Sequence, residues 1–401
     1  LRTLFEVWSA VQEAPQATPQ PSLTPTQTLT PVPVEPTLSV PAFQCQSNCL
    51  YYDLFVQSGN GVEVQGIYEF NLDTLEKHLL FDQVALMDMS PDQNQFLITR
   101  ETELYLVNRN RQSSQLVLEN LTPYSKQNAF FTADGSKIIA LTQQEAEKRI
   151  LVLDANTFDV LDDIETTQEP ANLIQYASSE TIYYEAGNCK GLHFCTTESY
   201  HGVDTATSQD TLMEGKERLV FSPDGSSMAF RDPQYADEVN YYHNPMLFYE
   251  ELEQGISSRR LFGFPHPGGF RVHPEITKYV FSPDSTALFV LQDAYSEYFE
   301  KSVGMHFFLE DLEQRIVLEY GSLEGAYGSL SPIPVWSPNG DALVLLLINT
   351  TNDRDFTFEL FRKDMLNRFS AFEPLMEPQP LEGYGYPNHA FWVKETLDEE
   401  Q

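Results

Sequence analysis

Short runs of apolar residues, separated by turn-forming residues, follow one another along most of this chain. Runs of this length that are rich in Val, Ile, Tyr and Phe predict β-strands. They include Leu50 to Val56, Gly66 to Leu72 and His78 to Phe81 near the start, and Ala390 to Val393 near the end. The longest apolar run, Ala342 to Ile348, has the length of a strand and falls short of the ~18 residues that cross a bilayer. The pattern predicts an all-β protein whose given chain has no transmembrane span.

A turn motif also recurs between these predicted strands. An apolar strand ends in an aromatic residue or Met, Ser-Pro-Asp-Gly or a relative follows, and a second apolar strand comes next. The five copies are Met89-Ser90-Pro91-Asp92, Phe131-Thr132-Ala133-Asp134-Gly135, Phe221-Ser222-Pro223-Asp224-Gly225, Phe281-Ser282-Pro283-Asp284 and Trp336-Ser337-Pro338-Asn339-Gly340. Pro presets φ at the second position of a type I turn, Ser caps the first and Gly fits the fourth. Each copy therefore predicts a tight hairpin.

The copies recur every ~42 to 60 residues, which is the period of four-stranded propeller blades. A degenerate copy at Ala177-Ser178-Ser179 fills the one gap in the spacing. These units make six blades. The strands at the two chain ends supply a seventh if the last strand pairs with the first blade, a closure that removes exposed sheet edges.

These motifs resemble the TolB-like family of propeller repeats, in which an aromatic-Ser-Pro-Asp-Gly turn precedes a later strand of the form Φ-Tyr-Φ-Φ-Asp. That later strand matches Leu104 to Asn108 and Ile150 to Asp154. The resemblance covers about Leu50 to Val393. It implies a β-propeller fold, and with the strand count above the prediction is a seven-bladed β-propeller of four-stranded antiparallel blades. Propellers of this kind serve as binding platforms, as domains that gate peptidases and as partners of envelope proteins.

The chain divides into four parts. Residues 1–13 form a short amphipathic segment, 14–44 a Pro/Thr-rich extended linker, 45–395 the propeller and 396–401 an acidic tail. In the first part an apolar stripe at helical spacing predicts a helix that docks on a partner, a membrane surface or the propeller, unless it is the remnant of a longer anchor. The stripe consists of Leu1, Leu4, Phe5, Trp8 and Val11. The prolines of the linker favour an extended, semi-rigid spacer.

Charge narrows the set of partners. The chain has 59 acidic and 24 basic residues, a formal net charge of −35, so a nucleic-acid backbone is repelled over most of the surface. This excess serves solubility in one interpretation and steers a cationic partner or divalent ions in another. The chain begins with Leu1, so we expect that an upstream signal or membrane anchor precedes it in the full protein.

The four cysteines form two close pairs, Cys45 with Cys49 and Cys189 with Cys195. Local pairing into two disulfides is the simpler interpretation and indicates an oxidising, extracytoplasmic compartment. We expect a periplasmic, cell-surface or secreted protein, and a bacterial one. A metal site is the alternative, but neither pair has C-x-x-C spacing and His193 is the only nearby imidazole.

Long segments between strands predict which face of the propeller is elaborated. They are Arg231 to Pro245, Gly263 to Thr277, Gln292 to Gly304, Gly321 to Pro332 and Leu375 to Pro387, all expected on the face opposite the motif turns over blades five to seven. Their aromatic residues are the predicted partner-binding surface, unless the rings only pack beneath their own loops. That surface consists of Tyr235, Tyr241, Tyr242, His243, Tyr295, Tyr298, Phe299, Tyr327, Tyr384 and Tyr386.

Acidic residues on the same segments are either a solvated rim or ligands of a divalent cation. They are Asp232, Asp237, Glu238, Asp293, Glu297 and Glu300. No EF-hand spacing is present, and His266 and His273 lie in a Pro/Gly-rich loop without a third ligand, so we predict no metal and no cofactor.

Catalytic signatures are also missing. Gly328-Ser329-Leu330-Ser331-Pro332 lacks the second Gly of a nucleophile elbow, and no motif copy carries the Trp of a sialidase Asp box. The sequence therefore predicts a non-catalytic binding or scaffold propeller, a tethered subunit of an envelope or cell-surface complex with a protein partner. The alternative is a propeller enzyme, a glycan or small-molecule hydrolase or lyase that uses acidic residues at the channel mouth.

Overall fold

Antiparallel β-strands make up the regular structure of the described residues, and no helix occurs among them. The computed structural model describes residues 38–58, 61–122, 127–144, 147–175, 180–189, 195–232, 247–252, 259–260, 272–296, 301–312, 316–323, 330–352, 355–365, 371–381 and 384–395. These residues belong to one compact unit, Thr37–Gln401. In this part of the chain no helix is long and apolar enough to cross a membrane.

The strands form seven hydrogen-bonded sheets, of which the first takes strands from both ends of the chain. It contains β1 (Ser47–Ser58), β2 (Gly61–Asn71), β3 (Lys77–Asp82), β29 (Tyr384–Tyr386) and β30 (Ala390–Glu395). The second contains β4 (Ala85–Met89), β5 (Gln95–Arg100), β6 (Glu103–Asn108) and β7 (Ser113–Leu118). The third contains β8 (Ala129–Phe131), β9 (Lys137–Gln144), β10 (Glu147–Asp154) and β11 (Val160–Ile164).

The remaining four sheets are each continuous in sequence. The fourth contains β12 (Pro170–Ile174), β13 (Thr181–Cys189), β14 (Cys195–Asp204) and β15 (Asp210–Leu212). The fifth contains β16 (Glu217–Phe221), β17 (Ser227–Arg231), β18 (Leu247–Glu251) and β19 (Arg259–Arg260). The sixth contains β20 (Val272–Phe281), β21 (Ala287–Ser296), β22 (Lys301–Asp311) and β23 (Ile316–Leu323). The seventh contains β24 (Leu330–Trp336), β25 (Ala342–Asn352), β26 (Asp355–Asp364), β27 (Glu373–Pro374) and β28 (Gln379–Leu381).

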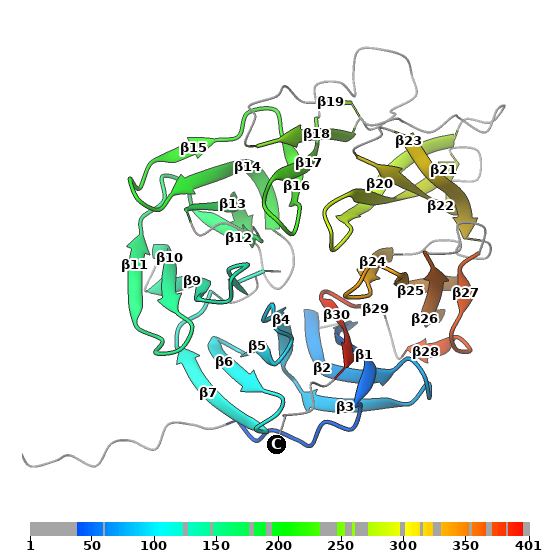
Figure 1. The fold of residues 1–401 in the computed structure, drawn as a ribbon, viewed down its shortest axis with the longest axis horizontal. Helices are drawn as coiled ribbons and strands as arrows, with labels where there is room; N and C mark the ends of the chain where they lie inside the picture. The colour runs from blue at the N-terminus through cyan, green and yellow to red at the C-terminus, as the bar shows by residue number, and fades with distance from the viewer. Residues whose placement is uncertain are drawn as a thin grey trace, which may run out of the picture. The chain divides into compact units, whose positions relative to one another are not determined.

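The sheets stand around a central axis in a β-propeller arrangement (Figure 1). In each sheet that is continuous in sequence, the first strand lies at the centre of the propeller. Strands such as β7, β11 and β15 lie at its outer edge. Burial follows this order. In the second sheet four residues each of β4, β5 and β6 are buried, whereas β7 has one buried residue. Inner strands are covered on both faces by neighbouring sheets, which is why their apolar residues run consecutively instead of alternating.

Each pair of neighbouring sheets shares its own apolar core. Leu97 of β5 packs with Phe131 of β8 and Ile138 of β9 between the second and third sheets, and six further clusters fill the other sheet interfaces. One of these clusters contains Trp392 together with Val344, so it lies between the first sheet and the seventh.

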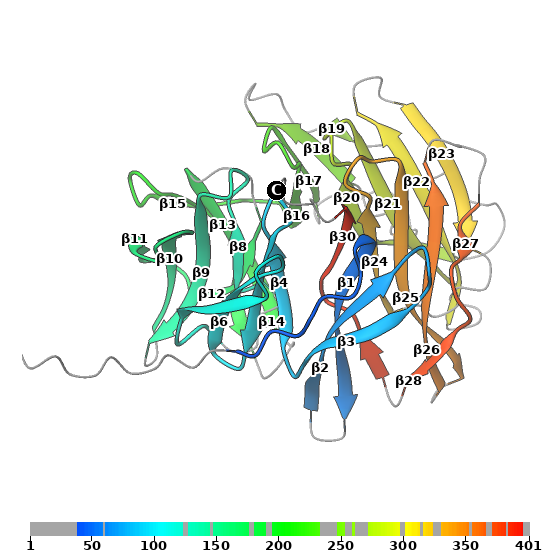
Figure 2. The same ribbon diagram turned by 60° about the horizontal axis from the view of Figure 1, so that its bottom comes forward.

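The two ends of the described chain meet in the first sheet. β30 pairs with β1 in antiparallel register, with Trp392 opposite Leu50 and Val393 opposite Cys49. β29 continues the same edge of β1, with Tyr386 opposite Phe55. Figure 2 shows β1, β2 and β30 side by side in a second view.

Part of the predicted linker packs on the first two sheets. Leu38 is buried and its carbonyl accepts a hydrogen bond from Ser114 Oγ at 2.6 Å. Phe43 stacks against Phe96, and a disulfide joins Cys45 to Cys49, which confirms the first predicted cysteine pair. From Leu38 onward the chain is therefore anchored to the propeller.

The second cysteine pair stays a prediction. Cys189 and Cys195 face each other directly in the register of β13 and β14, as a cross-strand disulfide requires. Their side chains lie outside the described residues.

The interpretation of the long segments as loops is partly wrong. Residues 272–277 and 292–296 continue as the paired strands β20 and β21, and residues 301–304 belong to β22. Residues 321–323 and 330–332 belong to β23 and β24, and β28 and β29 lie within the segment Leu375 to Pro387. Pairing with a neighbouring strand satisfies the backbone of a polar, aromatic-rich segment, and no local residue pattern announces that partner.

Candidate functional site

The motif turns share one geometry, and three of the five line a cavity that we call the channel; we call the turns its rim. In the first of them Gln93 N donates to Ser90 O at 2.8 Å, which closes the predicted turn, and Ser90 Oγ donates to Asp92 Oδ1 at 2.5 Å. The other copies repeat this geometry with Thr132 and Asp134, Ser222 and Asp224, and Ser282 and Asp284. In the last copy Asn stands at the Asp position, and Ser337 donates instead to Asp341, at 2.7 Å.

The fourth turn position has a positive φ in all five copies, which explains the glycine of the motif. The φ angles are 68° at Gly135, 71° at Gly225 and 72° at Gly340, but also 62° at Gln93 and at Ser285. Left-handed backbone of this kind favours glycine. Neighbouring turns also touch: a Cβ on Gly135 would lie 3.4 Å from Pro91, and Asp224 N donates to Ser285 Oγ at 3.3 Å.

A cavity of about 640 Å³ runs inward from this rim. Its described lining comes from the inner strands β4, β8, β12 and β16 and the turns after them, with one residue each from β13 and β20 and two from the segment before β30. At and next to the turns lie Met89, Pro91, Phe131, Thr132, Ala133, Ile174, Phe221, Ser222 and Pro223, and we call the apolar side chains among them the collar. The polar lining from the strands and the segments beside them consists of Asp88, Gln127, Asn172, Gln175, Glu185, Lys278, Asn388 and His389, and Leu173, Leu219 and Val220 complete the described lining.

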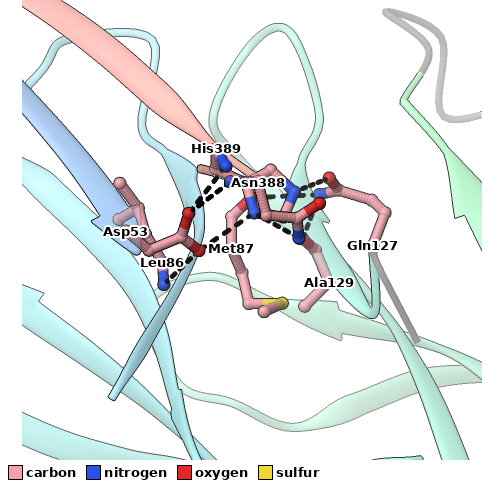
Figure 3. Close-up of polar contacts among 7 residues, drawn as sticks. All are labelled: Asp53, Leu86, Met87, Gln127, Ala129, Asn388 and His389. Carbon is pink, nitrogen blue, oxygen red and sulfur yellow. Dashed lines mark hydrogen bonds and ion pairs between the residues drawn. The ribbon is translucent and has the colours of Figure 1, made fainter. Parts of the chain in front are cut away.

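Asp53, in the middle of β1, and three residues that directly precede inner strands form what we call the floor network: Asp53, Gln127, Asn388 and His389 (Figure 3). The buried carboxylate of Asp53 accepts the backbone N–H groups of Asn388 at 2.9 Å and His389 at 2.8 Å through Oδ1, and that of Leu86 at 3.2 Å through Oδ2. A carboxylate buried in this way compensates for its lost hydration with these three donors.

His389 links this carboxylate to the other side of the floor network. Its Nδ1 lies 3.4 Å from Asp53 Oδ2, and its Nε2 lies 2.7 Å from Gln127 Oε1. Gln127 Nε2 donates onward to Met87 O at 3.1 Å and to Ala129 O at 2.8 Å. The chain's last inner strand is therefore tied to the first three sheets.

Asp88 is the second buried carboxyl group of the channel, and it lines the cavity. Its Oδ2 accepts the backbone N–H of Phe131 at 2.7 Å, and Gln175 Nε2 donates to both oxygens at 3.2 and 3.3 Å. Burial raises the pKa of Asp88 from 3.8 to about 7. The backbone hydrogen bonds from Phe131 and Met89 and the charge of His389 favour the ionised form, but burial outweighs them. Asp88 therefore changes its charge near neutral pH.

Glu185 supplies another carboxylate from β13. Its Oε2 accepts hydrogen bonds from Asn172 Nδ2 at 2.8 Å and from Thr197 Oγ1 at 3.1 Å, and both hydrogen bonds that Glu185 accepts from described residues end on this oxygen. Within those residues no group of three or more His, Cys, Asp and Glu side chains is placed to hold a metal ion.

Ser199, His201 and Asp210 are joined by hydrogen bonds on the fourth sheet, and none of the three is among the residues that line the cavity. His201 Nε2 lies 2.9 Å from Ser199 Oγ, and His201 Nδ1 lies 2.9 Å from Asp210 Oδ1. Asp210 Oδ2 also accepts Tyr184 OH, at 2.6 Å, and both the N–H and the hydroxyl of Thr167. The hydrogen bonds to Asp210 hold the edge strand β15 to β13, to β14 and to the segment before β12. Burial acts to raise the pKa of Asp210, but these hydrogen bonds outweigh it, so the pKa is lowered.

Most of the predicted partner-binding residues lie outside the described residues, namely Tyr235, Tyr241, Tyr242, His243, Tyr298, Phe299 and Tyr327. The same holds for the N-terminal stripe Leu1, Leu4, Phe5, Trp8 and Val11. Tyr295 lies opposite His273 in the β20–β21 ladder and Tyr384 opposite Gln57 in the β29–β1 ladder. Tyr386 is half-buried and stacks on Phe55 with ring centroids 5.7 Å apart, so for this residue the packing interpretation applies.

Sequence reasoning missed the cavity residues. The motif turns gave the only signal, because Asp88 precedes the first turn by one residue and is the sole carboxylate within an otherwise apolar inner strand, Ala85–Met89. A charged residue in such a run is unusual unless it is paired or functional.

Comparison with known proteins adds to the evidence for the fold. The sequence matches no protein-family model and no curated protein. Among solved structures, the chain is similar to oligogalacturonate lyase from Vibrio parahaemolyticus, with TM-score 0.51 and 11% identity, over 82% of this chain and 86% of that one. It is similar to the β-propeller domain of the Trilobed protease from Pyrococcus furiosus, with TM-score 0.51 and 13% identity, over 83% of this chain and 93% of that one.

TolB from Acinetobacter baumannii is also among the similar structures, with TM-score 0.39 and 14% identity, over 86% of this chain and 82% of that one. The two structures with TM-score 0.51 support the propeller fold alone, and at these identities they do not identify an activity.

Proposed function

We propose that this chain is a non-catalytic, extracytoplasmic binding propeller that captures a protein partner at the rim of its channel. We further infer that the seven sheets act as seven blades, and that the pairing of β30 with β1 closes the ring. The Cys45–Cys49 disulfide fits an oxidising compartment. The Pro/Thr-rich segment before Leu38 would tether the propeller to an envelope or cell-surface complex.

The observation that carries this proposal is the arrangement of the cavity. Apolar side chains and prolines line one part of the cavity, and the polar groups of its lining can fix the orientation of what enters, as in other concave binding sites. The buried carboxylates Asp53 and Asp88 already accept backbone N–H groups, so their first role is to hold inner strands together. The predicted Tyr-rich loops remain a second candidate contact surface.

A blocking substitution at the rim tests the proposal. Ala133 is exposed on a motif turn and lines the cavity, so Ala133→Trp should fill the opening while leaving the blade core untouched. Ala206→Trp, at an exposed position of the β14–β15 turn outside the cavity lining, is the matched control. We expect co-purification of the native partner to be lost with Ala133→Trp and retained with Ala206→Trp, at equal melting temperature. Equal partner recovery with both variants would refute the rim as the binding site.

An enzyme is the second candidate, and one observation favours it. Burial raises the pKa of Asp88 to about 7 within a cavity that also contains His389, and such a carboxyl group is suited to general acid–base chemistry on a glycan or a small molecule. Turnover in a hydrolase and lyase panel that disappears with Asp88→Asn would favour the enzyme. Binding without turnover would favour the scaffold.

A further inference from the structure

We propose that the channel cavity receives a basic side chain, an arginine or a lysine, from the partner. This inference rests on the proposed function, because it specifies the chemistry of the partner group that enters at the rim. It follows from three properties of the cavity: the carboxylates in its interior, the apolar collar and the charge of the whole chain.

The interior presents carboxylates to whatever enters. Glu185 keeps its Oε1 without a hydrogen bond from the described residues, while Asn172 and Thr197 hold its Oε2 in place. A carboxylate that is positioned through one oxygen and open at the other is prepared to accept a charge-assisted hydrogen bond.

Asp88, in β4 of the second sheet, adds a second acceptor to Glu185, which is in β13 of the fourth sheet. Its side chain is 1% exposed and lines the cavity, and Phe131 N and Gln175 Nε2 fix its orientation. Burial disfavours the charged form of this carboxyl group, and an entering cation would favour it. A guanidinium or ammonium group is therefore the complementary ligand.

The collar suits the stem of such a side chain. Met89, Phe131, Ile174 and Phe221 line the end of the cavity near the turns. Arginine and lysine bury their methylene groups against surfaces of this kind, and their charged heads are attracted to aromatic faces. A free inorganic cation would gain nothing from the collar, which favours a long basic side chain over an ion.

The remaining charges favour the same ligand. The described lining also contains two basic groups, Lys278, which is exposed, and His389, whose charge favours the ionised form of Asp88. The net charge of −35 raises the encounter rate with a basic partner and repels an acidic one.

A peptide series tests the proposal on the full chain at pH 8, where Asp88 is largely ionised. Acetylated, amidated Ala-Ala-Arg-Ala-Ala is compared by calorimetry and ligand-observed NMR with two analogues, one carrying citrulline and one glutamate in place of arginine. Citrulline has nearly the shape of arginine without its charge. We expect the arginine peptide to bind at least tenfold more tightly than the citrulline peptide. The glutamate peptide should not bind, and added salt should weaken the arginine complex.

Matched carboxylate variants locate the effect. Glu185→Gln should reduce the preference for arginine over citrulline about tenfold. Glu198→Gln, an exposed carboxylate of β14 outside the cavity lining, should leave the preference unchanged. Because the wild-type comparison of arginine with citrulline needs no variant, a Glu185→Gln protein that failed to fold would not remove the test.

The outcomes separate this inference from the proposed function. Three outcomes would overturn the proposal that a basic side chain enters the cavity. They are equal binding of the arginine and citrulline peptides, no binding of either peptide at about 10 mM, and equal effects of Glu185→Gln and Glu198→Gln. If Ala133→Trp still abolished partner capture in that case, the rim would stand as the binding site with another ligand chemistry. If Ala133→Trp left capture intact, the rim itself would be wrong.

Discussion

The rim and the floor of the channel are held together by different kinds of contact. At the rim, Ser90 reaches Asp92 and Gln95 within its own turn, and the other motif turns repeat this local pattern. At the floor, Asp53 binds Asn388 and His389, residues 335 and 336 positions away. A rim turn can therefore form from a few residues, whereas the floor exists only when the two chain ends have met. Substitutions at the two places should differ in size.

The largest effect is expected at the floor. Asp53→Ala leaves the backbone N–H groups of Leu86, Asn388 and His389 without their acceptor, so the free energy of unfolding should fall by about 3–5 kcal/mol. Urea denaturation at pH 7 measures the change. Asp82→Ala, at an exposed position of β3, is the control and should change stability by less than about 0.5 kcal/mol. A loss below about 1 kcal/mol for Asp53→Ala would remove the contrast between floor and rim.

The next effect depends on pH and belongs to Asp88. Its folded pKa of about 7 lies above the ordinary 3.8, so the folded state binds the proton more tightly than the unfolded chain. The resulting stabilisation is fully present below about pH 4 and is lost as the pH rises through 7. Between pH 5 and pH 8 this group should cost the wild type on the order of 2 kcal/mol, and Asp88→Asn should abolish that part of the slope. Parallel pH profiles for both proteins, from denaturant titrations, would contradict a buried, protonated Asp88.

A smaller loss is expected at the rim. Ser222→Ala removes the hydrogen bonds from Ser222 Oγ to Asp224 and from Ser227 N to Ser222 Oγ. The free energy of unfolding should fall by about 1–2 kcal/mol. Ser113→Ala, at an exposed position of β7, controls for loss of a hydroxyl group. A loss for Ser222→Ala as large as that for Asp53→Ala would show that rim and floor are equally critical.

The smallest effects come from the fourth turn position, where they should have opposite signs. Gln93→Gly relieves a non-glycine φ of 62° and should raise the melting temperature slightly, through about 0.5 kcal/mol. Gly225→Ala, at φ 71°, should destabilise by about 1 kcal/mol. Thermal melts of the two variants measure the pair. Shifts of the same sign would mean that the left-handed backbone does not set the preference for glycine.

The rim of the candidate site could be predicted from the sequence, whereas the residues inside the cavity could not. The turns that form the rim follow from residues such as Ser222, Pro223 and Asp224, and their positions were predicted residue by residue. The copy with Asn339 at the Asp position also forms its predicted turn, with Asp341 as the acceptor of the Ser337 hydroxyl. By contrast, nothing near Glu185 or His389 in the sequence marks them as neighbours of one cavity.

The predicted binding face shows why long segments mislead. Length and aromatic content alone pointed to loops at Gln292 to Gly304, yet Gln292–Ser296 and Lys301–Gly304 are paired strands. Whether such a segment is a loop or a strand depends on the availability of an edge to pair with, which is a property of the assembled sheet.

By itself, the sequence determined the β class of this protein, its repeating hairpins, the Ser-Asp hydrogen bonds of its turns and the Cys45–Cys49 pair, because each of these depends on residues within a few positions of one another. Only the tertiary structure decided that Asp53 meets His389, that Asp88 is buried with a pKa near 7 and that Glu185 faces the same cavity. Those properties depend on which strands the fold brings to the channel, and on the loss of water that follows when they pack together.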